Sequence, residues 1–171
     1  MNKTILITGA TSGIGKATAI HFAALGARLI LCGRRQERLN QLKEELPTVV
    51  HTLNFDVRDK ASVFKAIDSL PESFKNIDVL LNNAGNAHGL HDVIEANLDD
   101  WDTMIDGNVK GVMYVTKAIL PFMTERKSGH IINVGSIAGL EVYPKGNVYC
   151  ASKSALNAFT QGLRIDLNPL G

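Results

Sequence analysis

Residues 4–15 read Thr4-Ile5-Leu6-Ile7-Thr8-Gly9-Ala10-Thr11-Ser12-Gly13-Ile14-Gly15, and this stretch decides the fold. The apolar run over 5–7 stops at a Thr-Gly pair, as a buried parallel strand does. A helical pattern of apolar residues follows the glycines and closes at Gly26. Strand, glycine turn and helix in this order form the context that a dinucleotide fingerprint requires. The glycines are spaced G-x-x-x-G-x-G rather than G-x-G-x-x-G, so an ordinary glycine turn remains the alternative at this point.

A second apolar run, Leu29–Cys32, ends at Gly33-Arg34-Arg35. In a nucleotide-binding βαβ unit, an acidic residue near this point binds the ribose 2′-hydroxyl of NAD. Gly33 takes that place here, and the guanidinium groups behind it are suited to bind a 2′-phosphate. The pattern therefore favours NADP over NAD, although two arginines at the start of a solvated helix would look the same.

The alternation of strands and helices continues along the chain. We expect further strands over 49–54, 77–81 and 130–134, and helices over 36–46, 59–70, 99–120 and 149–167. Such alternation predicts a parallel sheet with right-handed crossovers. The expected fold is α/β, a Rossmann-type doubly wound parallel sheet of about five strands with helices on both faces. At this length we expect one dinucleotide-binding domain over residues 1–171.

An acid/base pair is expected on the helix over 149–167. Tyr149 and Lys153 are four residues apart, so on a helix they share one face. An ammonium within roughly 4–6 Å favours the phenolate and lowers the pKa of a phenol, which is otherwise about 10. A serine hydroxyl, which Ser136 could supply, would then polarise a substrate oxygen.

Further polar residues occupy positions that suit a ligand crevice. Asn82-Asn83-Ala84-Gly85 follow the fourth strand, and small and amide residues fit a crevice at a strand end. Asp56 follows the third strand, where it would either bond an adenine amino group or cap the next helix. Gly107 and Asn108 interrupt the long helix, at a cost in stability that a functional role would explain.

Composition argues against several other classes of function. Apolar residues make up 45%, charged residues 20% and the net charge is +1, so no strong field favours nucleic acid or an anionic membrane. No apolar run approaches the ~20 residues of a membrane span, so we expect a cytoplasmic protein. Cys32 and Cys150 lack metal spacing and are expected to be buried free thiols. His88 and His91 lack a third ligand, so no metal site is predicted.

Taken together, these motifs resemble the signature of the short-chain dehydrogenase/reductases. The resemblance is carried, in order and across essentially the whole chain, by Thr8-Gly9-x-x-x-Gly13-Ile14-Gly15, Asn82-Asn83-Ala84-Gly85, Asn108, Ser136 and Tyr149-x-x-x-Lys153. The stretches 33–39, 101–106 and 146–149 further resemble the NADP-dependent 3-hydroxy acid (serine-type) dehydrogenases.

The resemblance implies a role for each matched residue. Tyr149 would exchange a proton with the substrate oxygen, and Lys153 would bind the nicotinamide ribose and lower the pKa of the phenol. Ser136 would hold the substrate carbonyl or hydroxyl, and Asn108 would hold a water in a proton relay. The implied NADP-binding residues are Gly9, Thr11, Ser12, Gly13, Ile14, Gly15, Arg34, Arg35, Asp56, Val57, Asn83, Ala84, Gly85, Tyr149 and Lys153. The implied reaction is hydride transfer between NADP(H) and a secondary alcohol or carbonyl compound, with a 3-hydroxy acid such as serine as the candidate.

One departure from the family bears on activity. Family members are longer, and this chain ends where a sixth strand is expected, so the domain is interpreted as truncated there and the strand over 130–134 becomes a sheet edge. Two hypotheses therefore stand: an NADP-dependent oxidoreductase, or a catalytically inactive nucleotide-binding fragment or remnant that acts in an assembly. By resemblance we also expect a homo-oligomer, a dimer or tetramer, built through the helices around 100–122 and 149–167.

Overall fold

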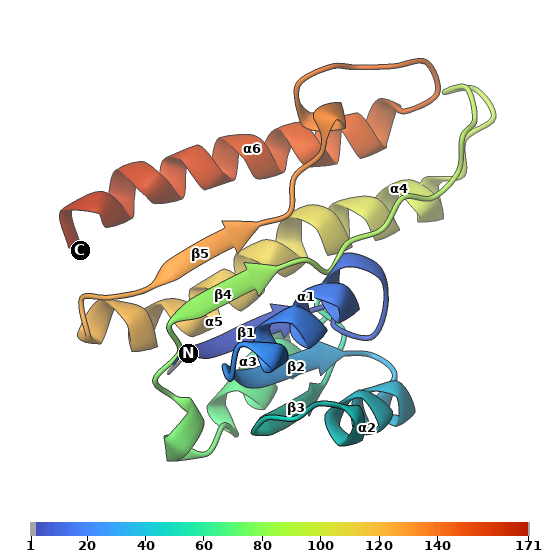
Figure 1. The fold of residues 1–171 in the computed structure, drawn as a ribbon. Helices are drawn as coiled ribbons and strands as arrows, with labels where there is room; N and C mark the ends of the chain where they lie inside the picture. Colours follow the sequence, from blue (N-terminus) through green and yellow to red (C-terminus); the bar gives the residue numbers. More distant parts are fainter. Residues whose placement is uncertain (1–2, 171) are drawn as a thin grey trace.

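The five apolar runs form one parallel sheet in the computed structural model, which describes residues 3–170 (Figure 1). The sheet order is β3-β2-β1-β4-β5. Its strands are β1 (Thr4–Thr8), β2 (Arg28–Gly33), β3 (Val50–Asn54), β4 (Val79–Asn82) and β5 (His130–Asn133). The order reverses between β1 and β4, so the fold is the doubly wound α/β type that the sequence predicts.

Helices cover both faces of the sheet because successive strand side chains point to opposite sides. Ile5 and Ile7 pack on one face, in a cluster that includes buried residues of α1 (Gly13–Ala24) and α2 (Gln36–Glu45). Leu6 packs on the other face, in a cluster with residues of α3 (Lys60–Asp68) and α5 (Val112–Glu125). The central strands are buried on both sides, which explains why they read as continuous apolar runs rather than as alternating patterns.

The long helix expected over 99–120 is continuous but contains a wider turn. It comprises α4 (Leu98–Ile105), a π-helical turn η2 (Asp106–Gly111) and α5. Gly107 and Asn108 therefore lie in a π-helical turn, not in a break. The final long helix α6 (Asn147–Leu167) packs against α4 and η2.

Most strand and helix boundaries differ from the sequence prediction by one or two residues. β4 begins at Val79, two residues later than expected; the Asp78 carboxylate before it accepts a hydrogen bond from the Thr4 N–H (2.8 Å) and anchors the start of β1. The third strand begins at Val50, one residue later than expected.

The ends of the strands position the site. All five strands point the same way, so their carboxyl ends meet at one edge of the sheet, beside the loops over 86–97 and 140–146 (Figure 1). None of the helices within the described residues is long and apolar enough to cross a membrane.

Candidate active site

The turn between β1 and α1 brings two backbone segments into close contact. Gly9 and Gly13 adopt positive φ angles of 66° and 53°, which glycine tolerates without strain. A Cβ on Gly15 would lie 2.4 Å from the Gly9 carbonyl oxygen and 2.5 Å from Asn83 Nδ2, so only glycine fits there. The turn therefore lies directly on the end of β4, with the amino end of α1 beside it.

Hydrogen bonds fix the end of β4 to this turn. Thr8 Oγ1 accepts from the backbone N–H groups of Asn83 and Ala84, both at 3.0 Å. Asn83 Nδ2 donates back to the carbonyl oxygens of Thr8 (3.0 Å) and Gly9 (3.3 Å). The carboxyl ends of two strands, β1 and β4, are thereby held together at the point where the strand order reverses.

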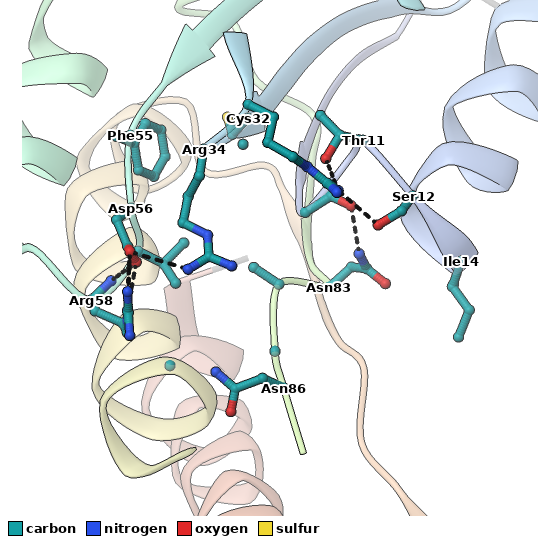
Figure 2. A pocket seen from close by; sticks show the side chains of 17 residues that line it. Thr11, Ser12, Ile14, Cys32, Arg34, Phe55, Asp56, Arg58, Asn83 and Asn86 are labelled. Carbon is teal, nitrogen blue, oxygen red and sulfur yellow. Dashed lines mark hydrogen bonds and ion pairs between the residues drawn. The ribbon is translucent and has the colours of Figure 1, made fainter. Parts of the chain in front are cut away.

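A groove of about 290 Å³ opens over these strand ends (Figure 2). Among the predicted cofactor-binding residues, those that line it are Gly9, Thr11, Ser12, Ile14, Arg34, Arg35, Asp56, Val57, Asn83, Ala84 and Gly85. Gly13 and Gly15 lie in the turn but are not part of the lining, and Tyr149 and Lys153 lie outside the groove. The lining also includes residues that were not among the predicted cofactor-binding residues: Cys32, Gly33, Phe55, Arg58, Asn86 and Gly107.

The two arginines after β2 have different partners. Arg35 Nη2 donates to Thr11 Oγ1 (2.7 Å) and Ser12 Oγ (3.2 Å), so it lies against the glycine turn. Arg34 instead faces Asp56, with Nη1 3.6 Å from Oδ2 (Figure 2). Both side chains are exposed in the groove, as cations that meet a ligand phosphate must be.

Asp56 makes its main contact with Arg58. The Arg58 Nε lies 3.1 Å and 3.0 Å from the two carboxylate oxygens, and Nη2 lies 2.7 Å from Oδ2. Burial opposes ionisation of Asp56, but hydrogen bonds from Arg58 and the charges of Arg58 and Arg34 outweigh it, so the pKa of Asp56 is lowered. The residue that caps α3 is Asp59, whose carboxylate accepts from the Ser62 N–H, so the capping role considered for Asp56 is excluded.

The carboxamide of Asn108 connects the groove to α6. Its Oδ1 accepts from the Asn86 N–H (2.8 Å), and its Nδ2 donates to the Asn86 carbonyl (2.8 Å) and to Ser152 Oγ (3.0 Å). Ser152 Oγ in turn donates to the Tyr149 carbonyl (2.8 Å). Asn86 Oδ1 is buried and has no hydrogen-bond partner among the described residues. Asn86 and Ser152 were missed because nothing in their local sequence marks them.

Lys153 and Tyr149 lie together on α6, as their spacing predicts. Lys153 Nζ is 5.9 Å from the centre of the Tyr149 ring and donates to the Val134 carbonyl at 2.9 Å. The side chain is buried, and burial lowers the pKa of the amine. Ser136 follows β5 with extended backbone, and its Oγ accepts from the Ala138 N–H at 3.1 Å.

Tyr149 lines a separate cavity of about 20 Å³ beside the loop over 86–97. The cofactor-sized groove and the acid/base pair are thus neighbouring features, joined through Asn86, Asn108 and Ser152. Within residues 3–170, no group of three or more His, Cys, Asp or Glu side chains is arranged to hold a metal ion.

A doubly wound parallel sheet with a glycine-lined groove at its carboxyl edge defines a Rossmann-type protein. Residues 3–171 match the short chain dehydrogenase family. The chain belongs to that family.

Several relatives resemble the chain over nearly all its length. The NADP-dependent 3-hydroxy acid dehydrogenase of Escherichia coli strain K12 is 47% identical over 164 residues, or 96% of this chain and 66% of that protein. Sulfoacetaldehyde reductase 2 of Chromohalobacter salexigens is 49% identical over 100% of this chain and 69% of that protein. The closed form of serine dehydrogenase complexed with NADP+ superposes with a TM-score of 0.91 at 47% identity, over 96% of this chain and 66% of that one. The chain therefore spans about two thirds of the length of the curated relatives it matches.

Proposed function

We propose that the protein is an NADP-dependent oxidoreductase that transfers a hydride between NADP(H) and a secondary alcohol or carbonyl compound, with a 3-hydroxy acid as substrate. The named activities of the relatives support the cofactor and the substrate class. The observation that carries the proposal is the buried amine of Lys153 beside Tyr149, on a helix tied to the end of β5. The same proposal places the protein in the cytoplasm as a homo-oligomer.

The groove fits NADP in three respects. The glycine turn leaves room for a pyrophosphate, and a Cβ on Gly15 would displace Gly9 and Asn83, which line the groove. Arg34 and Arg35 offer two guanidinium groups for a 2′-phosphate. Asn86 Oδ1, which has no partner among the described residues, offers an acceptor on the side of the groove nearest Asn108.

The chain's own residues would then carry the proton chemistry. When bound, NADPH supplies the hydride. The Tyr149 hydroxyl gives its proton to the substrate oxygen as negative charge develops there, and it takes a proton in the reverse direction. The Lys153 ammonium stabilises the phenolate that remains, because it is close and shielded from water. Ser136 Oγ holds the substrate oxygen, and Asn108 fixes the position of α6 through Ser152.

Replacement of Tyr149 by Phe tests the proposal. Loss of a positioned general acid lowers kcat by roughly 100-fold or more, whereas the affinity for NADPH stays near that of the wild type. Turnover is followed by the absorbance of NADPH with a panel of 3-hydroxy acids and their keto forms. Tyr114→Phe, a hydroxyl removed on α5 away from the groove, is the matched control and keeps full activity. Normal turnover by Tyr149→Phe would contradict the assignment.

A nucleotide-binding protein without turnover is the second candidate. The small size of the cavity beside Tyr149, about 20 Å³ against about 290 Å³ for the groove, favours it, because a hydroxy acid needs more room than the smaller cavity gives. Under this alternative the chain binds NADPH but reduces no member of a panel that includes serine-derived and sulfonate-bearing carbonyl compounds. Turnover of any member would exclude it.

A further inference from the structure

Asp56 places a carboxylate in a groove that is to hold a 2′-phosphate. It lines the groove, and its carboxylate lies 3.6 Å from Arg34, one of the two cations available for the phosphate. An unpaired carboxylate at this place would repel a phosphate and would compete with it for Arg34. The groove therefore needs some means of neutralising Asp56.

Arg58 supplies that neutralisation. Its guanidinium contacts both carboxylate oxygens through Nε and Nη2 at 2.7–3.1 Å, and its backbone N–H donates to Oδ1 at 3.0 Å. Charge-assisted contacts of this two-pronged kind are among the stronger hydrogen bonds in proteins. By contrast, Arg34 makes one contact to Asp56, and that distance of 3.6 Å is longer than a hydrogen bond.

The exposed fractions of the three side chains are consistent with Asp56 being paired to Arg58 rather than to Arg34. The Arg34 side chain is 65% exposed, against 34% for Arg58 and 27% for Asp56. Asp106 is the other carboxylate that attracts Arg58, but it is bonded to Lys110 at 2.8 Å. Asp56 and Arg58 thus form a pair, and Arg34 extends into the groove beside them (Figure 2).

We propose that Arg58 is a specificity-determining positioning residue: by occupying and neutralising Asp56, it leaves Arg34 available for the 2′-phosphate and so sets the preference for NADP over NAD. This inference rests on the proposed NADP-dependent function. Arg58 acts through Asp56 and Arg34, and its removal affects the binding of NADPH more than that of NADH.

The test compares dissociation constants of NADPH and NADH, measured by isothermal titration calorimetry on the whole chain at one fixed ionic strength. The variants are Arg58→Ala, Asp56→Asn and the double variant Arg58→Ala/Asp56→Asn. Lys60→Ala is the matched control, since it removes one exposed positive charge two residues further along. Binding is the readout, so the result does not depend on turnover.

In Arg58→Ala we expect the preference for NADPH over NADH to fall by about two- to fivefold, the size of one partly exposed ion pair. The dissociation constant of NADPH changes and that of NADH does not. Without Arg58, the Asp56 carboxylate is unpaired and attracts Arg34, and only NADPH carries the 2′-phosphate that this affects. The double variant regains the wild-type preference, since an amide neither repels the phosphate nor holds Arg34. Lys60→Ala keeps the wild-type preference.

Three outcomes would overturn the inference. An unchanged preference in Arg58→Ala shows that Asp56 does not disturb the phosphate. Equal weakening of both cofactors shows that Arg58 only supports the local structure, and a double variant that stays impaired shows that Arg58 binds the phosphate directly. Failure of the proposed function is separate and is read from the wild type: it would bind NADPH no better than NADH, or bind neither.

Discussion

Burial of the Lys153 side chain lowers the stability of the fold and places a positive charge beside Tyr149. Lys153 as a whole is only 8% exposed, so its amine loses hydration, and the hydrogen bond to the Val134 carbonyl compensates for part of that loss. Burial accordingly lowers the pKa of Lys153 from its ordinary value of 10.5. The positive charge needed beside Tyr149 is therefore held at a cost to folding.

Lys153→Met should make that cost visible as a dependence on pH. Between the lowered pKa of the folded protein and 10.5, the unfolded chain binds more protons at this site than the folded one, so the free energy of unfolding rises with pH. Below that window both states are protonated and the burial cost is constant. We expect the wild type to gain stability relative to Lys153→Met as the pH rises from the lowered pKa of the folded protein toward 10.5, measured by urea denaturation. An exposed control, Lys117→Met, should show no such gain, and a parallel course for wild type and Lys153→Met would refute the prediction.

Residues that act through near neighbours in sequence could be found without the structure. The spacing of Tyr149 and Lys153 predicts a shared helix face, and Gly33-Arg34-Arg35 predicts cations at the end of β2. Asn86 and Ser152 could not be found this way, because their roles depend on hydrogen bonds to Asn108, 22 and 44 residues away in the chain. Only the packing of η2 against α6 brings them together.

At the scale of elements, the turn between β1 and α1 depends on the absence of a side chain. Gly15 lies against the Gly9 carbonyl and the Asn83 amide, which belong to the turn and to the end of β4. The Gly9 carbonyl is backbone, and the Asn83 side-chain amide is held by its hydrogen bonds to the carbonyl oxygens of Thr8 and Gly9, so the structure cannot adjust cheaply. The distance between the two strand ends is thus set by this glycine.

Gly15→Ala should destabilise the fold by roughly 1–3 kcal/mol, the usual cost of forcing extra volume into a packed site, and should also weaken NADPH binding. The matched control is Gly162→Ala in α6, where an added Cβ meets no atom within 4 Å. There alanine should instead stabilise by roughly 0.4–1 kcal/mol, since it restricts the unfolded chain. Thermal and urea unfolding measure both effects; equal responses at the two positions would show that helix propensity, not contact, controls Gly15.

The sequence predicted the position of the irregular turn η2 but not its geometry. Gly107 and Asn108 predicted an interruption of the helix, and the structure keeps the helix while widening one turn. The wider turn accommodates a close approach, since a Cβ on Gly111 would lie 2.8 Å from Val57 Cγ2. The helix propensities of these residues indicate that a regular α-helix is disfavoured here. They do not indicate that the helix forms a π-helical turn to fit against Val57, which follows β3.

At the scale of the whole molecule, β5 is an edge strand of the sheet within residues 3–170. Within the described residues β5 pairs only with β4, so its other edge presents free backbone groups, and Ile132 is 38% exposed. Flat apolar edges of this kind promote pairing between molecules.

Ile132→Lys should therefore reduce self-association with little change in stability. A charge on an exposed edge strand opposes pairing between molecules, and a substitution at an exposed position usually changes the free energy of unfolding by less than about 0.5 kcal/mol. Light scattering during incubation near the melting temperature measures the association. Ile131→Lys is the control: Ile131 packs on the buried cluster beneath α5, so its replacement should unfold the protein instead. Unchanged aggregation of Ile132→Lys would show that another surface is responsible.

The overall architecture was predictable because it depends on patterns that repeat. The central strands β1, β2 and β4 contain continuous apolar runs, helices connect the successive strands, and handedness leaves few ways to combine them. The pairing of Asp56 with Arg58 could not be predicted in this way. It depends on side-chain geometry at one strand end, which no periodicity encodes.

The order of the strands in the sheet has a consequence for how the chain folds. Ile5 of β1 pairs with Leu29 on one side and with Val79 on the other, so the second pairing closes a loop about three times longer. By loop-closure entropy alone that adds roughly 1 kcal/mol to the cost of docking β4. During synthesis at about 5–20 residues per second, β1 thus spends several seconds with one edge open before β4 emerges. β1, whose residues are all buried in the folded protein, therefore has one edge open to pairing with other chains during that interval.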